Sequence, residues 1–214
     1  MKGLLKNNFL AVCSNMKVFA LLMALLGIFT AAVISRSLVI GCALLSIVGF
    51  SMIAVTGMKK EFASKWGKYK LTLPVNRANI VKSYFISQLI WLAVGAAFAG
   101  VSICLSWVLH GCPFDNNIDT LSVFSVGISV SLFMGAFFFP LFYSIGEEKS
   151  EVFLVISLLC GIGIAMGIVS AVNFCLAPGF TTVLFGDAIL IVCALFIFVL
   201  SYPLTVHIYR EKEY

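Results

Sequence analysis

Glutamates, cysteines and histidines are the side chains of this sequence that could carry chemistry, and none has the spacing that a reaction needs. The pair Glu147 and Glu148 is followed by K-S-E-V, which lacks the arginine of the intramembrane protease pattern E-E-x-x-x-R. The seven cysteines contain no C-x-x-C pair, and the sequence has no H-E-x-x-H or G-x-x-x-x-G-K-[ST] motif. We therefore predict a protein that is not an enzyme and that binds no metal, cofactor or nucleotide itself.

Ionisable residues in the middle of an apolar stretch would indicate transport driven by protons or sodium, because a charge inside the bilayer needs a partner. The apolar stretches of this chain carry none centrally. Asp187, His110 and His207 lie close to the ends of such stretches. We interpret all three as interfacial residues that water solvates, so the energy for any transport must come from elsewhere.

The polar segment with the most information lies at about residues 58–84. Four side chains recur at i, i+4, i+7 and i+11, the spacing of one helix face: Phe62, Trp66, Tyr69 and Leu73. Lysines flank this face, which is typical of an interfacial helix with aromatic rings among lipid headgroups. Pro74 then breaks the helix, and Asn76 is placed to cap a new one. A basic loop that only fixes the topology remains the alternative.

Long apolar stretches must position these polar segments. Of the 214 residues, 62% are hydrophobic and 11% are charged, against roughly 25% charged in a soluble domain. Charged residues separate six stretches that are long enough to cross a bilayer as helices. These stretches cover residues 18–35, 38–58, 85–109, 121–145, 152–174 and 183–206. We therefore predict an all-α polytopic membrane protein with six spans in one transmembrane domain, residues 1–214.

The basic residues predict how this domain is oriented. Three lie in the N-terminal tail, seven lie from Lys59 to Lys82, and Lys149, Arg210 and Lys212 follow, whereas Arg36 is alone on the other side. The positive-inside rule then places both termini and the 58–84 loop in the cytoplasm. Because the net charge of +5 is distributed over these loops, we do not predict binding to nucleic acid.

Small residues, prolines and outer cysteines leave several alternatives open. Gly163 and Gly167 form a G-x-x-x-G step, which suits close helix packing either within the subunit or in a dimer. The prolines at 140 and 203 each remove a backbone donor and are placed to bend a helix. Cys112 and Cys175 are both predicted at the outer face, and the sequence does not decide whether they form a disulfide.

Two segments of the chain resemble one known family. Residues 61–82 read E-F-A-S-K-W-G-K-Y-K-L-T-L-P-V-N-R-A-N-I-V-K, similar to the acidic residue, tryptophan, T-L-P-V-[SN]-R and I-V signature of small six-span ABC-2 type permeases. Residues 140–149 read P-L-F-Y-S-I-G-E-E-K and resemble the P-[LI]-x-[FY]-x-[FI]-G-x-E-K segment of that family. Phenol-soluble-modulin exporter permeases belong to this group. Ser144 replaces a frequent basic residue, and Glu151 sits near a frequent arginine.

The resemblance implies the permease half of an exporter in the bacterial cell membrane. Two permeases, identical or different, would pair, and a separate ATP-binding subunit that uses ATP and Mg²⁺ would dock on each. Amphipathic or antimicrobial peptides, or other hydrophobic compounds, are the implied substrates. The matching positions give the candidate residues for coupling to the ATPase: Glu61, Phe62, Trp66, Tyr69, Leu73, Pro74, Arg77, Gly146, Glu147, Glu148 and Lys149.

Two other functions fit the apolar spans. One is the substrate-capture subunit of an energy-coupling-factor importer, which would not need a coupling loop of this kind. The other is a membrane scaffold or immunity protein that transports nothing. A neighbouring gene for an ATP-binding cassette subunit would favour the exporter.

Overall fold

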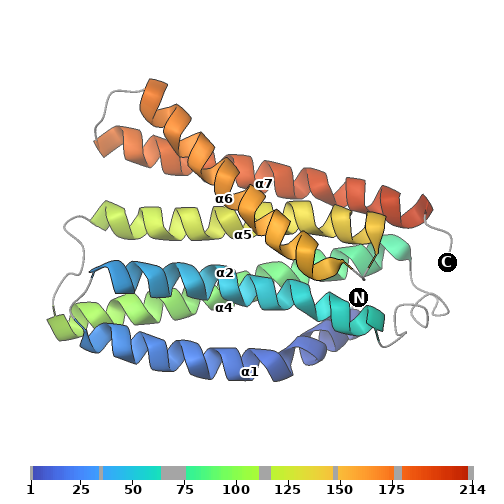
Figure 1. Ribbon diagram of the computed structural model, residues 1–214, viewed down its shortest axis with the longest axis horizontal. Coiled ribbons are helices and arrows are strands. Elements are labelled where there is room, and N and C mark those ends of the chain that lie inside the picture. Colours follow the sequence, from blue (N-terminus) through green and yellow to red (C-terminus); the bar gives the residue numbers. More distant parts are fainter. Residues whose placement is uncertain are drawn as a thin grey trace.

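The computed structural model describes residues 2–33, 36–63, 76–110, 117–146, 149–175 and 180–211 (Figure 1). Six long helices make up nearly all of these residues, as the sequence predicts. In chain order they are α1 (Lys2–Ala32), α2 (Arg36–Ala63), α4 (Arg77–His110), α5 (Asn117–Ile145), α6 (Ser150–Cys175) and α7 (Phe180–Glu211).

Five of these helices contain segments that are long and apolar enough to cross a membrane. The segments are Ser37–Met58, Ala78–Leu109, Ile118–Ile145, Ser150–Cys175 and Thr182–Glu211. The apolar segment of α1 is shorter, Met16–Thr30, because lysines, asparagines and a serine interrupt the apolar residues in the first half of that helix. In the part of the chain that the structure describes, the prediction of six spans thus becomes five candidate spans and one shorter apolar helix.

The helices extend beyond the apolar stretches from which the spans were predicted. Helix α1 begins at Lys2, where the sequence predicted a tail. Its Asn8 is buried and donates from Nδ2 to the Ser83 hydroxyl oxygen at 3.0 Å, so the polar end of α1 packs against α4. Similarly, α2 continues to Ala63 and α4 begins at Arg77, so both ends of the predicted 58–84 loop are helical. Hydropathy finds only the apolar part of each helix.

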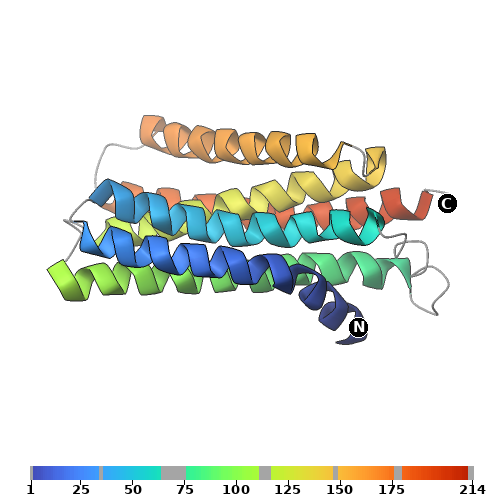
Figure 2. The same ribbon diagram turned by 60° about the horizontal axis from the view of Figure 1, so that its bottom comes forward.

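The helices run alternately in opposite directions, and both termini lie at one end of the bundle (Figure 1). Helix α2 packs mainly on α4 and α1, whereas α5 packs mainly on α7 and α6 and also contacts α2. Figure 2 shows α6 on the outside of the bundle. Helix α5 therefore connects the group of α1, α2 and α4 with α6 and α7.

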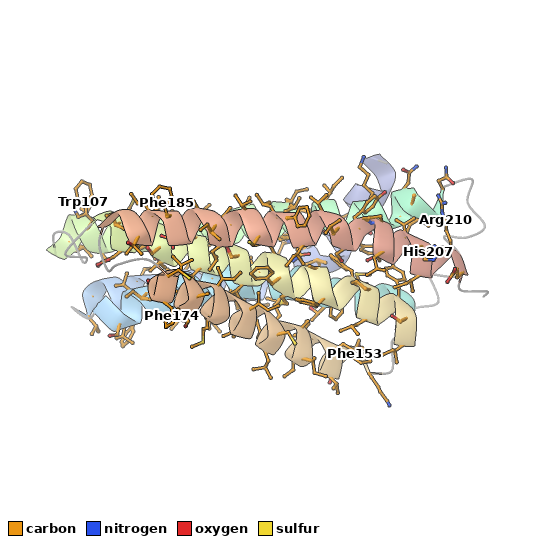
Figure 3. The ribbon with its side chains drawn as sticks, turned by 90° about the horizontal axis from the view of Figure 1, so that it is seen from above. Trp107, Phe153, Phe174, Phe185, His207 and Arg210 are labelled. Atoms are coloured by element: carbon orange, nitrogen blue, oxygen red, sulfur yellow. The ribbon has the colours of Figure 1, made fainter. Side chains whose placement is uncertain are left out.

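The core lies around α5, and the surface is apolar. Leu132, Phe133 and Met134 of α5 are each 1% exposed or less. In contrast, Phe174 is 93% exposed, as expected for a side chain that lipid covers. Trp107, Phe174 and Phe185 lie toward the end of the bundle opposite to His207 and Arg210 (Figure 3). Exposed aromatic rings at one end are typical of a membrane interface.

Candidate functional site

The α2–α4 connection contains most of the residues that the resemblance implicates. Glu61 and Phe62 lie in the last turn of α2, and Arg77 is the first residue of α4. The positions of Trp66, Tyr69, Leu73 and Pro74 fall outside the described residues. The structure therefore gives the two flanks of this connection, at the end of the bundle that also holds both termini (Figure 1).

Asn76 fixes where α4 begins. Its carbonyl oxygen accepts hydrogen bonds from the backbone N–H groups of Asn79 (2.9 Å) and Ile80 (3.3 Å). The predicted start of a helix directly after Asn76 is therefore confirmed. Ile80 and Val81 follow and are 2% and 0% exposed, so α4 enters the core within its first two turns.

Aromatic rings lock the first half of α4 to α5 and α7. The Phe85 ring centroid lies 4.4 Å from that of Phe139 in α5 and 5.0 Å from that of Phe198 in α7. The Tyr202 ring meets Phe85 edge-on at 5.6 Å, and its hydroxyl donates to the Ala78 carbonyl at 3.4 Å. The first half of α4 is therefore in close side-chain contact with both α5 and α7.

The second implicated connection joins α5 to α6. Gly146 has a φ of 107°, and its N–H donates to the Phe142 carbonyl at 3.1 Å, which ends α5 in the left-handed conformation that favours glycine. Glu147 and Glu148 fall in the gap before residue 149 and outside the described chain. The Lys149 side chain is exposed, and its carbonyl accepts the Phe153 N–H at 3.1 Å at the start of α6.

A buried amide joins three helices further along α4, and the sequence reasoning missed it. Gln88 is 1% exposed, and its Nε2 donates to the Ser131 carbonyl of α5 (2.9 Å) and the Ser51 hydroxyl of α2 (3.2 Å). Gly135 makes room for this amide, because a Cβ at that position would collide with it. The available signal was that the one glutamine of the chain lies in an apolar span.

Asp187 corrects another interpretation from the sequence. It is 6% exposed, and its Oδ2 accepts a hydrogen bond of 2.6 Å from the Ser122 hydroxyl of α5, so it is not a solvated interfacial residue. The position of Asp187 near the end of an apolar stretch does not indicate the direction in which its side chain points. His207 is exposed, as expected, and its Nε2 lies 3.2 Å from Glu211 Oε1. The His110 side chain is outside the described part.

The glycines of α6 divide into two kinds. A Cβ at Gly161 would lie 3.2 Å from the Val130 carbonyl oxygen, so α6 approaches the α5 backbone there. Gly163 and Gly167 have open space around them. The G-x-x-x-G step is therefore not used for packing among the described residues of this subunit.

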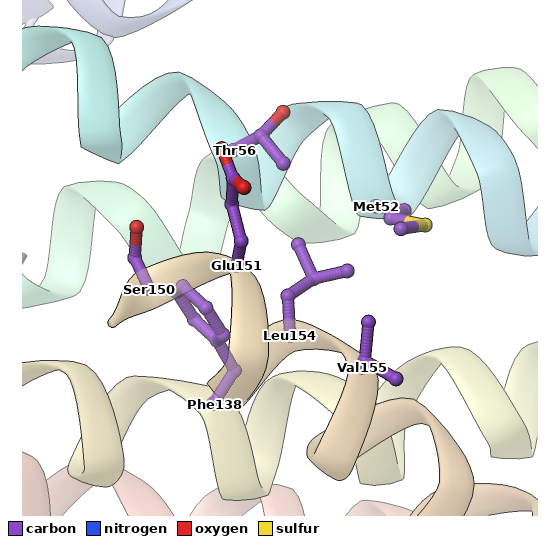
Figure 4. A pocket seen from close by; sticks show the side chains of 7 residues that line it. All are labelled: Met52, Thr56, Phe138, Ser150, Glu151, Leu154 and Val155. Atoms are coloured by element: carbon purple, nitrogen blue, oxygen red, sulfur yellow. The ribbon is translucent and has the colours of Figure 1, made fainter. Parts of the chain in front are cut away.

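A cleft opens between α2, α5 and α6 beside the α5–α6 connection. Its volume is about 180 Å³, and the apolar part is lined by Met52 of α2, Phe138 of α5 and Leu154 of α6 (Figure 4). A second cleft of about 290 Å³ lies between α5 and α6 and includes Val130 and Met166. No three His, Cys, Asp or Glu side chains gather as a metal site within the described ranges.

Comparison with known proteins identifies the family. Residues 3–210 match the family described as ABC-2 family transporter protein. No curated protein and no solved structure matches the chain. The matched region covers all six helices except the first residue of α1 and the last residue of α7. The chain therefore belongs to the ABC-2 family and is a multi-pass membrane component of an ABC-2 type transporter.

Proposed function

We propose that this chain is the permease subunit of a bacterial ABC exporter in the cell membrane. Membership of the ABC-2 family shows that the chain is the membrane component of an ABC-2 type transporter. The export direction, the bacterial membrane and the cytoplasmic termini are our inferences from the signature segments and from the basic residues that gather at one side. A separate ATP-binding subunit supplies the energy and binds ATP and Mg²⁺, and a second permease, identical or different, completes the pore.

In this proposal the α2–α4 connection transmits movement from the ATPase. The contact residues are Glu61, Phe62, Trp66, Tyr69, Leu73, Pro74 and Arg77. The observation that carries the proposal is the anchoring of α4: Phe85 packs on Phe139 and Phe198 within three turns of Arg77. A push on the start of α4 therefore reaches α5 and α7 without passing through a flexible segment.

The α5–α6 connection makes a smaller contact with the ATPase. We assign it to Gly146, Glu147, Glu148 and Lys149, and the helix ends that flank it, the end of α5 and the start of α6, lie at the same end of the bundle as the start of α4 (Figure 1). Its exposed Lys149 directly precedes α6, so this contact acts on the helix that lies on the outside of the bundle. The substrates we propose are amphipathic or antimicrobial peptides or other hydrophobic compounds.

Substitutions in the α2–α4 connection test the proposal. Trp66→Ala removes the aromatic anchor and Arg77→Glu reverses a charged contact, and anchors of this kind commonly contribute about 2 kcal/mol or more. Both variants should reach normal membrane abundance, lose ATPase co-purification and lose substrate stimulation of ATP hydrolysis. Trp107→Ala is the matched control, because Trp107 is 59% exposed near the opposite end of α4.

Retained ATPase binding and export would contradict the coupling role of the α2–α4 connection. If Trp66→Ala and Arg77→Glu both retain ATPase binding and export, whereas replacing the lysines disrupts only insertion, then the connection is a topology signal. Mass spectrometry of the purified complex would count permeases and ATPases together.

A further inference from the structure

A groove between the first turns of α4 and the second half of α7 combines one cation with apolar walls. Its volume is about 200 Å³, and the residues that line it are Lys82, Phe85, Phe198, Val199 and Tyr202. Phe85 and Phe198 are each 5% exposed and form its floor, whereas Val199 and the adjacent Leu200 are 65% and 53% exposed. The groove therefore opens toward the apolar outer surface of the bundle.

Contacts between α4 and α7 fix the walls of this groove. The Phe85 ring centroid lies 5.0 Å from that of Phe198, and the Tyr202 ring meets Phe85 edge-on at 5.6 Å. The Tyr202 hydroxyl donates its one hydrogen to the Ala78 carbonyl at 3.4 Å, so it has none left for a ligand. Among the described residues that line the groove, Lys82 is then the side chain that can donate to a ligand.

The charge of Lys82 lies inside an apolar segment and close to its end. Lys82 follows Ala78, the first residue of the apolar segment of α4, by four residues, which is about 6 Å along the helix axis. The side chain is exposed, and no carboxylate of the described residues forms an ion pair with it. A lysine at this depth packs its methylene stem on apolar surface and extends its ammonium to the headgroup level. The ligand that complements this groove is an anion at headgroup level that carries an apolar chain.

We propose that the groove binds an anionic phospholipid such as phosphatidylglycerol, with its phosphate at the Lys82 ammonium and one acyl chain over Phe85 and Val199. Basic pockets between membrane helices are known to bind anionic headgroups. The volume of about 200 Å³ exceeds the roughly 150 Å³ of an engineered apolar cavity that holds benzene, so part of one chain fits. A zwitterionic lipid is a poorer match, because the lining has no carboxylate for its choline or ethanolamine cation.

Photolabelling of the full-length chain in phosphatidylcholine nanodiscs tests the proposal. The probe is phosphatidylglycerol with a diazirine in one acyl chain, and the matched probe is phosphatidylcholine with the same chain. Mass spectrometry of the peptides should find the glycerol probe on groove residues several-fold more than the choline probe. Lys82→Ala should reduce labelling by the glycerol probe about fivefold, the contribution of one basic residue near an anionic surface. Lys82→Arg keeps the charge and should keep the preference.

Lys17 of α1 provides a matched control for general attraction between basic residues and anionic lipid. It is also exposed, it has no ion pair with a described carboxylate, and it follows the first residue of the apolar segment of α1, but it does not line the groove. Lys17→Ala therefore removes the same charge at a similar depth. It should leave labelling of the groove by both probes unchanged.

Two valines of α7 test the acyl-chain part of the site. Val199 lines the groove and Val192 does not, although their exposed fractions are 65% and 64%. Val199→Trp should fill the groove and abolish labelling of its α4 wall by the glycerol probe, whereas Val192→Trp should retain it. Because both variants add the same bulk to one helix, a folding defect common to tryptophan would affect both.

Several results would overturn the proposal. Equal labelling by the two probes, or a loss in Lys17→Ala as large as that in Lys82→Ala, would show general attraction without a site. Stronger displacement of the probe by oleate than by unlabelled phosphatidylglycerol would assign the groove to a fatty acid. Cross-links from the groove to a second copy of the chain would make it a subunit contact. None of these measurements uses an ATPase or a transported substrate, so their outcome is separate from that of the proposed function.

Discussion

Gln88 and Gly135 form a matched pair of residues inside the bundle. Both hydrogens of the Gln88 amide are used, one by Ser131 of α5 and one by Ser51 of α2. In a low-dielectric interior these bonds hold three helices at one depth, although interhelical hydrogen bonds in membrane proteins average only about 0.6 kcal/mol each. The absence of a side chain at Gly135 is what lets the amide reach α5.

We predict that Gly135→Ala destabilises the protein by about 1–3 kcal/mol, the usual cost of overpacking. The new methyl group would collide with the Gln88 amide and displace it from its hydrogen bonds to Ser131 and Ser51. Thermal unfolding in detergent measures the effect. Gly163→Ala is the control, because it adds the same methyl group to a helix where the structure leaves open space. If the two variants unfold at the same temperature, the close contact between Gly135 and the Gln88 amide does not contribute to stability as we predict.

A double substitution tests the same contact from the other side. Gln88→Ala removes the group with which the methyl collides, so Gly135→Ala should cost less in that background than in the native chain. The two changes should therefore be non-additive. If the two destabilisations are additive, Gly135→Ala acts through a contact other than the one with Gln88.

Within helix α5, Pro140 leaves one backbone carbonyl without its usual donor, and a side chain of α7 supplies the missing hydrogen bond. Proline has no N–H, so the carbonyl of Ala136 has no donor four residues later in its own helix. The Ser201 hydroxyl of α7 donates to that carbonyl at 2.6 Å. The predicted role of Pro140 as a helix-bending residue stays a prediction, but its missing donor explains a contact between two helices that pack closely.

We predict that Ser201→Ala costs about 1–3 kcal/mol, because it leaves the Ala136 carbonyl buried without a donor. In a Pro140→Ala background the cost should shrink, since residue 140 would then supply its own N–H. Ser157→Ala is the control: Ser157 is as buried, but its hydroxyl bonds to the Leu154 carbonyl of its own helix at 2.9 Å. Equal costs in both backgrounds, read from chemical or thermal unfolding, would contradict this account.

The sequence predicted the number and order of the helices but not their lengths or their polar contacts. Hydropathy locates an apolar run, whereas a helix continues as long as its backbone bonds and packing allow, which is why α1 begins at Lys2. The contacts of Asn8, Gln88 and Asp187 depend on which way each helix faces. Apolar spans carry almost no amphipathic signal that would reveal this, because lipid and core are equally apolar.

The two ends of the bundle carry different exposed residues, with His207 and Arg210 toward one end and Trp107, Phe174 and Phe185 toward the other (Figure 3). Both termini and the start of α4 lie at one end (Figure 1), and the exposed rings of Trp107 and Phe174 lie toward the other (Figure 3). The described helix ends that flank the two implicated connections, the end of α2 and of α5 and the start of α4 and of α6, also lie at the end of the termini (Figure 1). The orientation of this end in the membrane therefore decides whether an ATPase in the cytoplasm can reach the candidate coupling residues.

We predict that the end with the termini faces the cytoplasm, because nearly all Lys and Arg residues lie on that side of the predicted spans. Single-cysteine chains in intact cells test this with a thiol reagent that does not cross membranes. Cys175 is an exposed free thiol at the end of α6 and should be labelled, as should Cys112, which lies outside the described residues. Cys13 of α1 should react only after permeabilisation, and so should Glu211→Cys, an exposed position at the end of α7.

Labelling of Cys13 and Glu211→Cys in intact cells, with Cys112 and Cys175 protected even after reduction, would reverse the topology. The α2–α4 connection would then face away from any cytoplasmic ATPase, and its coupling role would fall with it.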